Sequence, residues 1–209
     1  MSAASEEAVP PIPVLVFART PVPGQVKTRL IPAIGAERAA NLHRAMLWRT
    51  VATATAAAIG PVALWCSPVA EHPLIDELQR EFGLDVGVQQ GVDLGERMHR
   101  ALQTCPAGAV LVGSDCPFLE EQDLQMAAGI LRDGDDAAIG PAEDGGYYLI
   151  GVRDSDMSVF SGIPWGTDGV LAATRQNFRD LGWRWREIAT RRDVDRPEDL
   201  AAVGELLIY

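Results

Sequence analysis

Short, almost purely apolar segments alternate along this chain with alanine-rich or amphipathic segments of helical length. The first apolar run, PVLVFA at 13–18, is typical of a strand that is covered on both faces of a sheet. The segment 36–58 then carries Leu42, Met46, Leu47 and Val51 at roughly helical spacing, which predicts one long helix. Because this strand and helix unit recurs, we expect a mostly parallel, doubly wound sheet with helices on both faces.

The same patterns locate the other elements of this sheet. They predict strands at 62–66, 85–89, 109–112, 136–140, 147–152 and 185–188, and helices at 73–82, 94–104, 121–131, 169–181 and 197–207. The turn-rich segment that joins the strands at 136–140 and 147–152 is where we expect the sheet to become mixed. With 209 residues and no low-complexity linker, the chain fits one α/β domain over 13–209, an α/β/α sandwich, after a flexible tail over 1–12.

Composition and charge argue against several functional classes. A net charge of −11 is unsuited to coating nucleic acid, which requires an excess of lysine and arginine. The longest apolar stretch, 56–66, is interrupted by Gly60 and Pro61 and is shorter than the roughly 20 residues of a membrane span. The N-terminus lacks the basic start and apolar core of a secretory signal, and the three cysteines show no C-x-x-C spacing. We therefore expect a cytoplasmic protein without a zinc site or a membrane span.

Polar motifs follow the expected strands, at the sheet edge where ligands bind in such folds. The loop after the first strand contains Arg19, Gly24, Lys27 and Arg29, and Lys27 is the only lysine in the chain. Basic groups beside a glycine that permits close backbone approach suit the binding of a nucleotide's phosphates. The loop has neither P-loop nor G-x-G-x-x-G spacing, and a solvated surface loop is the alternative interpretation.

Two acidic segments are candidates for binding Mg²⁺ or Mn²⁺. Asp115 directly follows the apolar strand at 109–112, where a carboxylate suits a hard cation held against a diphosphate. Helix capping or turn stabilisation is the alternative role for this residue. Asp193 and Asp195 alternate along an extended segment and therefore project to the same side. The acids after them are explained by the start of the last helix, which leaves Asp195 as the second candidate ligand.

Three further positions have two interpretations each. Asp144, in the turn 143–146, is a candidate to contact acceptor hydroxyls, act as a base or bind metal, although Asp-Gly also suits a hairpin turn. Arg97 lies in the first turn of a helix that Asp93 is expected to cap, and it is a candidate contact for a phosphate or a base. Trp165 either stacks on a sugar or fills the core.

Six motifs occur in order along the chain: FARTPVPGQVKTRL (17–30), DLGERM (93–98), GSDCP (113–117), EDGGYYLIG (143–151), WGTD (165–168) and DVDRPEDL (193–200). Together they resemble the DUF2064 family of GT-A-fold proteins, over about 14–200. That family is described as glycosyltransferase-like, with some members linked to arsenosugar biosynthesis. It is related to guanylyltransferases that act on phospholactate or the molybdenum cofactor. The resemblance implies a GT-A-like fold of the nucleotide-diphospho-sugar transferase superfamily.

The resemblance also implies roles for particular residues. Lys27 and Arg29 fall where nucleotidyltransferases place basic residues that bind phosphate. Asp115 corresponds to the metal-binding aspartate of GT-A enzymes, with Asp-Cys-Pro in place of the D-x-D of many glycosyltransferases. Asp195 falls where relatives place a second aspartate or asparagine on the metal.

The function expected from the motifs is a metal-dependent transferase that uses a nucleotide-diphospho-sugar to glycosylate a small acceptor. Asp115 and Asp195 would hold the cation and face the basic loop across a gap of diphosphate size, with Lys27 neutralising the leaving group. Asp144 would orient or deprotonate the acceptor. Nucleotidyl transfer from an NTP to a small phosphorylated acceptor, with release of pyrophosphate, needs nearly the same site. A non-catalytic nucleotide-binding protein is a further alternative.

Overall fold

The computed structural model of the chain describes residues 10–204. Its strands are β1 (Val14–Arg19), β2 (Val62–Ser67), β3 (Asp85–Val88), β4 (Ala109–Gly113), β5 (Ala137–Pro141), β6 (Tyr147–Val152) and β7 (Trp185–Glu187). Its α-helices are α1 (Ile31–Ile34), α2 (Ala36–Ala56), α3 (Pro73–Phe82), α4 (Leu94–Leu102), α5 (Glu121–Arg132) and α6 (Val170–Asp180). Three 3-10 helices are η1 (Thr28–Leu30), η2 (Met157–Phe160) and η3 (Pro197–Val203).

The strands form one seven-stranded sheet in the order β3-β2-β1-β4-β6-β5-β7. Strand β6 is antiparallel to both of its neighbours, and every other pairing is parallel. The predicted α/β fold with a mostly parallel, mixed sheet is therefore confirmed, and the sheet becomes mixed at the β5–β6 hairpin where the sequence predicted it. Because β1, β4, β5 and β7 all run the same way, the loops that follow them leave from one edge of the sheet.

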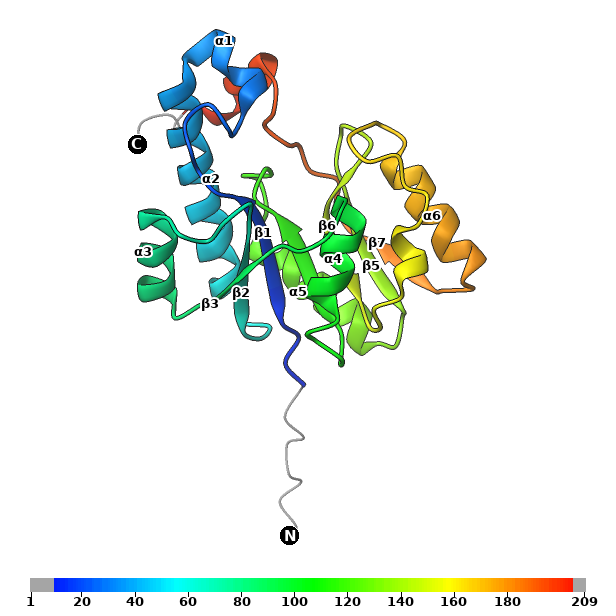
Figure 1. The fold of residues 1–209 in the computed structure, drawn as a ribbon. Helices are drawn as coiled ribbons and strands as arrows, with labels where there is room; N and C mark the ends of the chain where they lie inside the picture. The colour runs from blue at the N-terminus through cyan, green and yellow to red at the C-terminus, as the bar shows by residue number, and fades with distance from the viewer. Residues whose placement is uncertain (1–9, 205–209) are drawn as a thin grey trace.

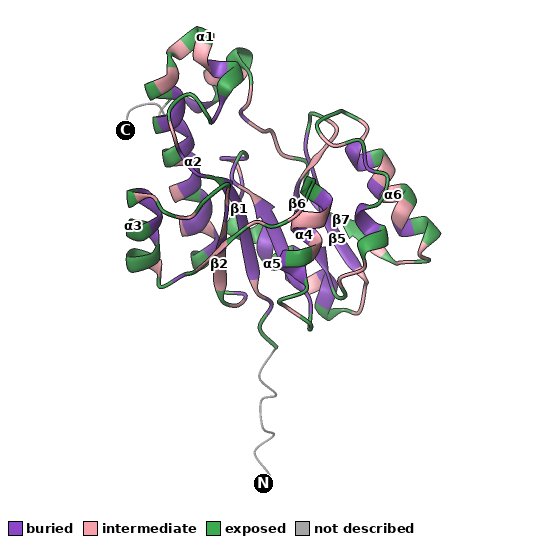
Figure 2. Cartoon of the chain, viewed as in Figure 1, coloured by how far each residue is buried: buried purple, intermediate pink, exposed green. Residues whose placement is uncertain are grey.

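Helices cover both faces of this sheet, which gives three layers (Figure 1). Helices α2, α3 and α5 share one apolar core with the sheet, whereas α4, η2 and α6 contribute to a second core on the other face. Strands β1 and β4 lie between the two cores, and their side chains are almost all buried (Figure 2). This explains why both strands are near-continuous apolar runs in the sequence.

A third, smaller apolar cluster lies beyond the carboxyl edge of the sheet. It joins η1 to the first half of α2 and to the segment that leads into η3, through Leu30, Met46, Val194 and Val203. All four side chains are buried. The cluster fixes the loop after β1 against the residues that follow β7, although these segments are more than 160 residues apart in the chain.

The structure differs from the sequence-based expectation mainly at short elements. The sequence did not predict η1 and α1, which are too short to show a periodic pattern. The helix expected at 197–207 is a 3-10 helix in the part that the structure describes, and its last residues lie outside that part. The tail expected at 1–12 also lies mostly outside it. Within residues 10–204, none of the helices combines the length and the hydropathy needed to cross a membrane.

Candidate functional site

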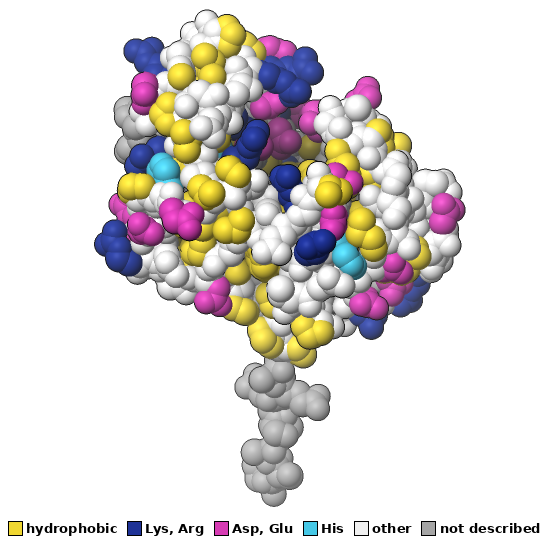
Figure 3. All heavy atoms as spheres, viewed as in Figure 1, with side chains coloured by type: hydrophobic (Ala, Val, Ile, Leu, Met, Phe, Trp, Pro, Cys, Tyr) yellow, Lys and Arg dark blue, Asp and Glu magenta, His cyan; other side chains and the backbone are white. Residues whose placement is uncertain are grey.

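A cleft of about 640 Å³ opens at the carboxyl edge of the sheet. It is formed by the loops that follow β1, β2, β3 and β4, together with the start of α4 and the segment around Asp193 and Asp195. In Figure 3 basic and acidic side chains meet in the hollow between the two halves of the molecule. This is the edge at which doubly wound α/β folds bind ligands.

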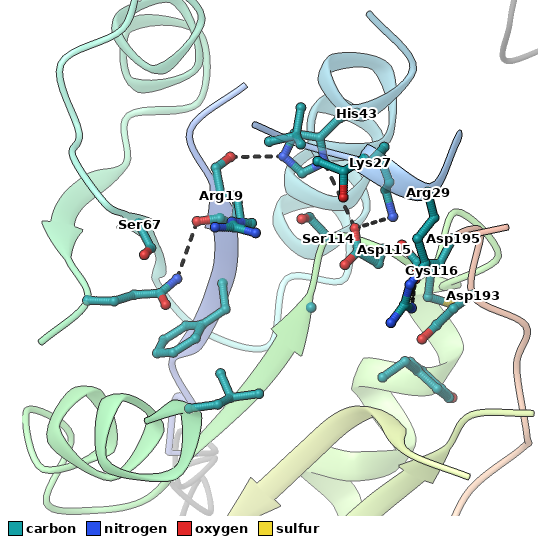
Figure 4. A pocket seen from close by; sticks show the side chains of 18 of the residues that line it. Arg19, Lys27, Arg29, His43, Ser67, Ser114, Asp115, Cys116, Asp193 and Asp195 are labelled. Atoms are coloured by element: carbon teal, nitrogen blue, oxygen red, sulfur yellow. Dashed lines mark hydrogen bonds and ion pairs between the residues drawn. The ribbon is translucent and has the colours of Figure 1, made fainter. Parts of the chain in front are cut away.

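Lys27 is buried at the floor of this cleft. Its side chain is 3% exposed, and its Nζ lies 2.5 Å from Asp115 Oδ1 and donates a hydrogen bond to the carbonyl of Val194 at 2.7 Å. Its backbone is left-handed, with φ of 47°, a conformation that non-glycine residues seldom adopt. A left-handed residue between the loop and η1 turns the chain so that the ammonium points inward (Figure 4).

Val194 connects the two acidic segments. Its N–H donates to the carbonyl of Asp115 at 3.0 Å, its own carbonyl accepts from Lys27, and its side chain is buried in the third cluster. Because side chains alternate along extended backbone, burying Val194 turns Asp193 and Asp195 away from that cluster. Both line the cleft, as the alternation in the sequence predicted.

Asp115 carries a stabilised negative charge. Desolvation at the cleft floor raises its pKa, but the adjacent Lys27 ammonium and His43 outweigh this, so that the pKa lies below its ordinary value. The carboxylate stays 55% exposed and is therefore accessible to a ligand from the cleft. The expected gap between Lys27 and Asp115 is absent in this structure, because the two opposite charges are in direct contact.

Asp193 and Asp195 lie in different environments. Asp195 forms an ion pair with Arg29, and both side chains are well exposed. Asp193 is half-buried, and its Oδ1, which is itself buried, has no hydrogen-bond partner among residues 10–204. Burial and the negative charges of Asp115 and Asp144 raise the pKa of Asp193 to about 7. An unpartnered carboxylate oxygen beside other carboxylates is a group that a cation would stabilise.

The residues present fit a divalent cation in their chemistry. Asp115, Asp193 and Asp195 supply the hard oxygen ligands that Mg²⁺ and Mn²⁺ take, and the orphaned Asp193 Oδ1 faces this cluster of charges. Within residues 10–204, no three His, Cys, Asp or Glu side chains are already grouped as a metal site. Lys27 and Arg29 instead pair with two of the three carboxylates.

His43 is a cleft residue that the sequence did not reveal. It lies on α2 with 2% exposure, its Nε2 is 2.9 Å from the carbonyl of Arg19, and its Nδ1 lies 3.9 Å from Asp115 Oδ1 with no hydrogen-bond partner. Burial lowers its pKa despite the opposing charge of Asp115. A single histidine inside a helical pattern gives no sequence signal, because only the packing of α2 against β1 brings it to the site.

The other predicted nucleotide-binding residues occupy different places. Arg19 is exposed and lines the cleft at the end of β1. Arg97 lines it from α4, where its guanidinium donates to the carbonyl of Gly91 at 3.1 Å and to Ser67 Oγ at 3.4 Å. Gly24 is not among the lining residues, and its φ of 80° accounts for glycine there through turn geometry. Its phosphate contact stays a prediction.

A second cavity of about 820 Å³ adjoins the first. Asp144 lines it rather than the first cleft, and its Oδ1 accepts a hydrogen bond from Gly146 N–H at 2.9 Å, which is the turn role that the sequence also allowed. Trp165 lines this cavity while it also packs against the second core. Tyr147, Asp193 and Asp195 border both cavities, so the two form one continuous site.

Comparison with known proteins assigns the family. The profile of the family described as "Uncharacterized protein conserved in bacteria (DUF2064)" matches residues 50–167, more than half of the chain. The chain belongs to the DUF2064 family. Among curated proteins, none matches this DUF2064 protein in sequence.

Solved structures share the fold over nearly the whole chain. A protein from Desulfovibrio desulfuricans G20, which is proposed to be a nucleotide-diphospho-sugar transferase, is 30% identical, with a TM-score of 0.80 over 93% of this chain and 96% of its own. CMP:2-keto-3-deoxy-manno-octonic acid synthetase, solved with CTP, is 13% identical, with a TM-score of 0.57 over 95% and 98%.

Glucosyl-3-phosphoglycerate synthase from Mycobacterium tuberculosis, solved with Mn²⁺, UDP and glucosyl-3-phosphoglycerate, is also 13% identical, with a TM-score of 0.55 over 94% of this chain and 76% of its own. The GT-A and nucleotidyltransferase-like fold of the DUF2064 protein is thereby established. The two relatives at 13% identity carry the fold alone.

Proposed function

We propose that this DUF2064 protein is a metal-dependent transferase that uses a nucleotide-diphospho-sugar donor to glycosylate a small acceptor. The observation that carries the proposal is the contact of Lys27 with Asp115 at the floor of the cleft, at 2.5 Å. A buried ammonium and an accessible carboxylate lie together where two parallel strands end. This pairing is suited to a diphosphate and its cation, because the phosphate can pair with the ammonium and the cation with the carboxylate.

The nucleotide occupies the first cleft in this proposal. Lys27 and Arg29 bind the phosphates from the loop after β1, and Arg19 adds a third positive charge at the end of that strand. Arg97 lies further along the cleft with Ser67, where it contacts the nucleoside or a phosphate oxygen. Four basic side chains and three carboxylates line this cleft, so basic groups slightly outnumber acidic ones there, although the whole protein has a net charge of −11.

Asp115 and Asp195 would hold the Mg²⁺ or Mn²⁺ ion, with the half-buried Asp193 as a third candidate ligand. When bound, the cation would neutralise charge on the diphosphate leaving group. Lys27 turns from Asp115 to a phosphate oxygen, and Arg29 does the same from Asp195. Each basic residue therefore exchanges a carboxylate for a phosphate as the ligands enter. Lys27 then stabilises the negative charge that develops on the departing diphosphate.

The acceptor enters through the second cavity, beside Asp144. This carboxylate lies on the β5–β6 turn at the edge of that cavity and is exposed. It is the group proposed to orient the acceptor hydroxyl or to take its proton, which requires hydrogen-bond contact with the attacking oxygen. Tyr147 borders both cavities and marks where donor and acceptor meet.

Nucleotidyl transfer is the second candidate function. The concentration of basic residues in the first cleft favours it, because release of pyrophosphate places more charge there than release of a nucleoside diphosphate. The two reactions differ in the atom attacked, which is C1 of the sugar or the α-phosphorus. A protein that binds nucleotide without turnover would show binding that is indifferent to Mn²⁺.

The test is a product assay with matched donors. The protein is incubated with nucleotide sugars or with NTPs, in Mn²⁺ or Mg²⁺, and the release of nucleoside diphosphate or pyrophosphate is measured. The proposal predicts nucleoside diphosphate from a nucleotide sugar, and loss of at least about 100-fold of that rate in Asp115→Asn. Asp85→Asn, an exposed carboxylate at the start of β3, is the control and keeps the rate. Pyrophosphate release alone would replace the proposal with nucleotidyl transfer.

A further inference from the structure

The two cavities differ sharply in charge. The first is lined by four basic side chains and three carboxylates. The second is lined by seven carboxylates and three arginines. Arg29, Asp193 and Asp195 belong to both linings, so the difference arises from the residues that line one cavity only. In the second these are two further arginines, Arg192 and Arg196, and a set of five acids: Glu143, Asp144, Asp168, Glu198 and Asp199.

Four of these five carboxylates form no ion pair in the described part of the chain. Asp199 is paired with Arg192 at 2.8 Å. Among residues 10–204, Glu143, Asp144, Asp168 and Glu198 form no ion pair, and Arg196 likewise pairs with none of the acids. The four unpaired acids are exposed toward solvent. Apart from the proposed metal ligands, the second cavity is therefore lined by four carboxylates and one arginine that form no ion pair with any described residue.

The hydrogen-bonding chemistry of this lining is also one-sided. An ionised carboxylate accepts hydrogen bonds and donates none. Of the four unpaired acids, only Asp144 accepts a hydrogen bond within the described part of the chain, from Gly146 N–H. A ligand must therefore bring its own donors. Hydroxyl groups do this, whereas a phosphate dianion or a carboxylate brings only acceptors and meets repulsion.

An aromatic side chain is held rigidly in the same cavity. Trp165 is half-buried, and a Cβ at Gly95 would lie 2.9 Å from its Cζ2, so the indole is packed closely against α4. The ring lines the cavity beside Gly166, Thr167 and Asp168. A fixed aromatic surface next to carboxylates offers apolar contact to the carbon skeleton of a polyol and hydrogen-bond acceptors to its hydroxyls.

We infer that the second cavity takes an uncharged, polyhydroxylated acceptor, such as a sugar or polyol, and discriminates against phosphorylated or carboxylated ones. The inference rests on the proposed function, since it places the acceptor in this cavity. It separates the two candidate reactions as well, because the nucleotidyl transfer considered above uses a phosphorylated acceptor.

The experiment compares matched pairs of probes on protein loaded with UDP and Mn²⁺. Glucose and glucose 6-phosphate, mannose and mannose 6-phosphate, and glycerol and glycerol 3-phosphate are titrated by saturation-transfer NMR. The uncharged member of at least one pair is expected to bind at least about tenfold more tightly than its phosphorylated partner, because four unpaired like charges lie within Coulomb range. Equal or tighter binding of the phosphorylated members, or binding of no uncharged probe, would overturn the inference.

Two variants test whether these carboxylates cause the discrimination. In Glu143→Gln combined with Asp168→Asn, the preference should fall at least about threefold, since half of the unpaired charge is removed. Neither side chain makes a hydrogen bond or ion pair within residues 10–204, so the fold should tolerate both changes. The control combines Glu81→Gln with Asp85→Asn, two exposed acids on the α3–β3 side. An unchanged preference in the first variant would also overturn the inference.

Calorimetry of UDP and of the other common nucleoside diphosphates, each with Mn²⁺, is performed first on the same protein, and one that binds takes the place of UDP if UDP does not. Absence of binding by all of them would count against the proposed function itself. Binding of UDP without any preference for uncharged probes would leave the proposed function standing and remove only the inference about the acceptor.

Discussion

Replacing Lys27 with methionine should shift the affinities for metal and nucleotide in opposite directions. The Lys27 Nζ lies 2.5 Å from Asp115 Oδ1 and competes with any cation for that carboxylate. Two unit charges about 4 Å apart in water interact by about 1 kcal/mol, so an ammonium and a divalent ion repel by about 2 kcal/mol. Asp115 is half-exposed but the Lys27 ammonium is buried, so the water value is a lower limit for this repulsion. Removing the ammonium should therefore tighten Mn²⁺ binding without nucleotide by at least about 30-fold.

Nucleotide binding should weaken in the same variant. A charge-assisted hydrogen bond contributes about 1.5–3 kcal/mol, so the affinity for UDP in the presence of Mn²⁺ should fall by at least about tenfold. Free Mn²⁺ is measured by electron paramagnetic resonance and UDP by calorimetry, with Arg80→Met on the surface of α3 as the control. Melting curves verify folding, because the carbonyl of Val194 also loses its donor. Weaker Mn²⁺ binding in Lys27→Met, or unchanged affinity for UDP, would refute the reasoning.

Three further predictions concern stability, each measured by urea denaturation. Gly145→Ala should lower the free energy of unfolding by about 3 kcal/mol or more, because the φ of Gly145 is 88° and a Cβ would lie 2.3 Å from a backbone oxygen. Gly182→Ala, with open space around the new Cβ, should lower it by about 1–2 kcal/mol. Equal costs would contradict this. Without metal, the free energy of unfolding should fall as pH rises from about 4 to about 7. Over this range the folded protein keeps a proton on Asp193, whose pKa is about 7, whereas the unfolded chain has lost that proton. Asp193→Asn should remove this fall, and an unaltered pH profile would exclude the residue as its source. Asp123→Ala should cost about 3 kcal/mol, because Asp123 is 2% exposed and both its pair with Arg191 and the hydrogen bond that it accepts from Glu120 N–H are lost, which leaves Arg191 only its exposed partner Glu120. Asp133→Ala, in an exposed pair, should cost less than about 1 kcal/mol.

The sequence predicted the fold well where periodicity was long or burial complete. Helices α2 and α3 and strands β1, β4 and β6 lie within one or two residues of their predicted bounds. Each either repeats an apolar face over several turns or is buried on both faces of the sheet. The short η1 and α1 have no such pattern. The 3-10 geometry of η3 depends on how it packs through Val203 against α2, which local sequence does not encode.

The candidate site was predictable in its residues and less so in its contacts. Lys27, Asp115 and Asp195 were identifiable because they follow strands that share one edge of the sheet. Their direct pairing was not, since the sequence does not show that the third cluster brings Val194 between them. His43 was missed because only the packing of α2 against β1 brings it to the cleft. The acids of the second cavity come from three distant segments, 143–144, 168 and 193–199, and their excess appears only when these segments are placed together.

The most direct test of the central claim is the affinity for Mn²⁺ measured with and without UDP. Because Lys27 and Arg29 pair with Asp115 and Asp195, the proposed metal ligands, a diphosphate that draws them away should make cation binding easier. After correction for the Mn²⁺ that UDP binds by itself, the account predicts at least about tenfold tighter binding with UDP, and loss of this effect in Asp115→Asn. An affinity for Mn²⁺ that is the same with and without UDP would contradict it.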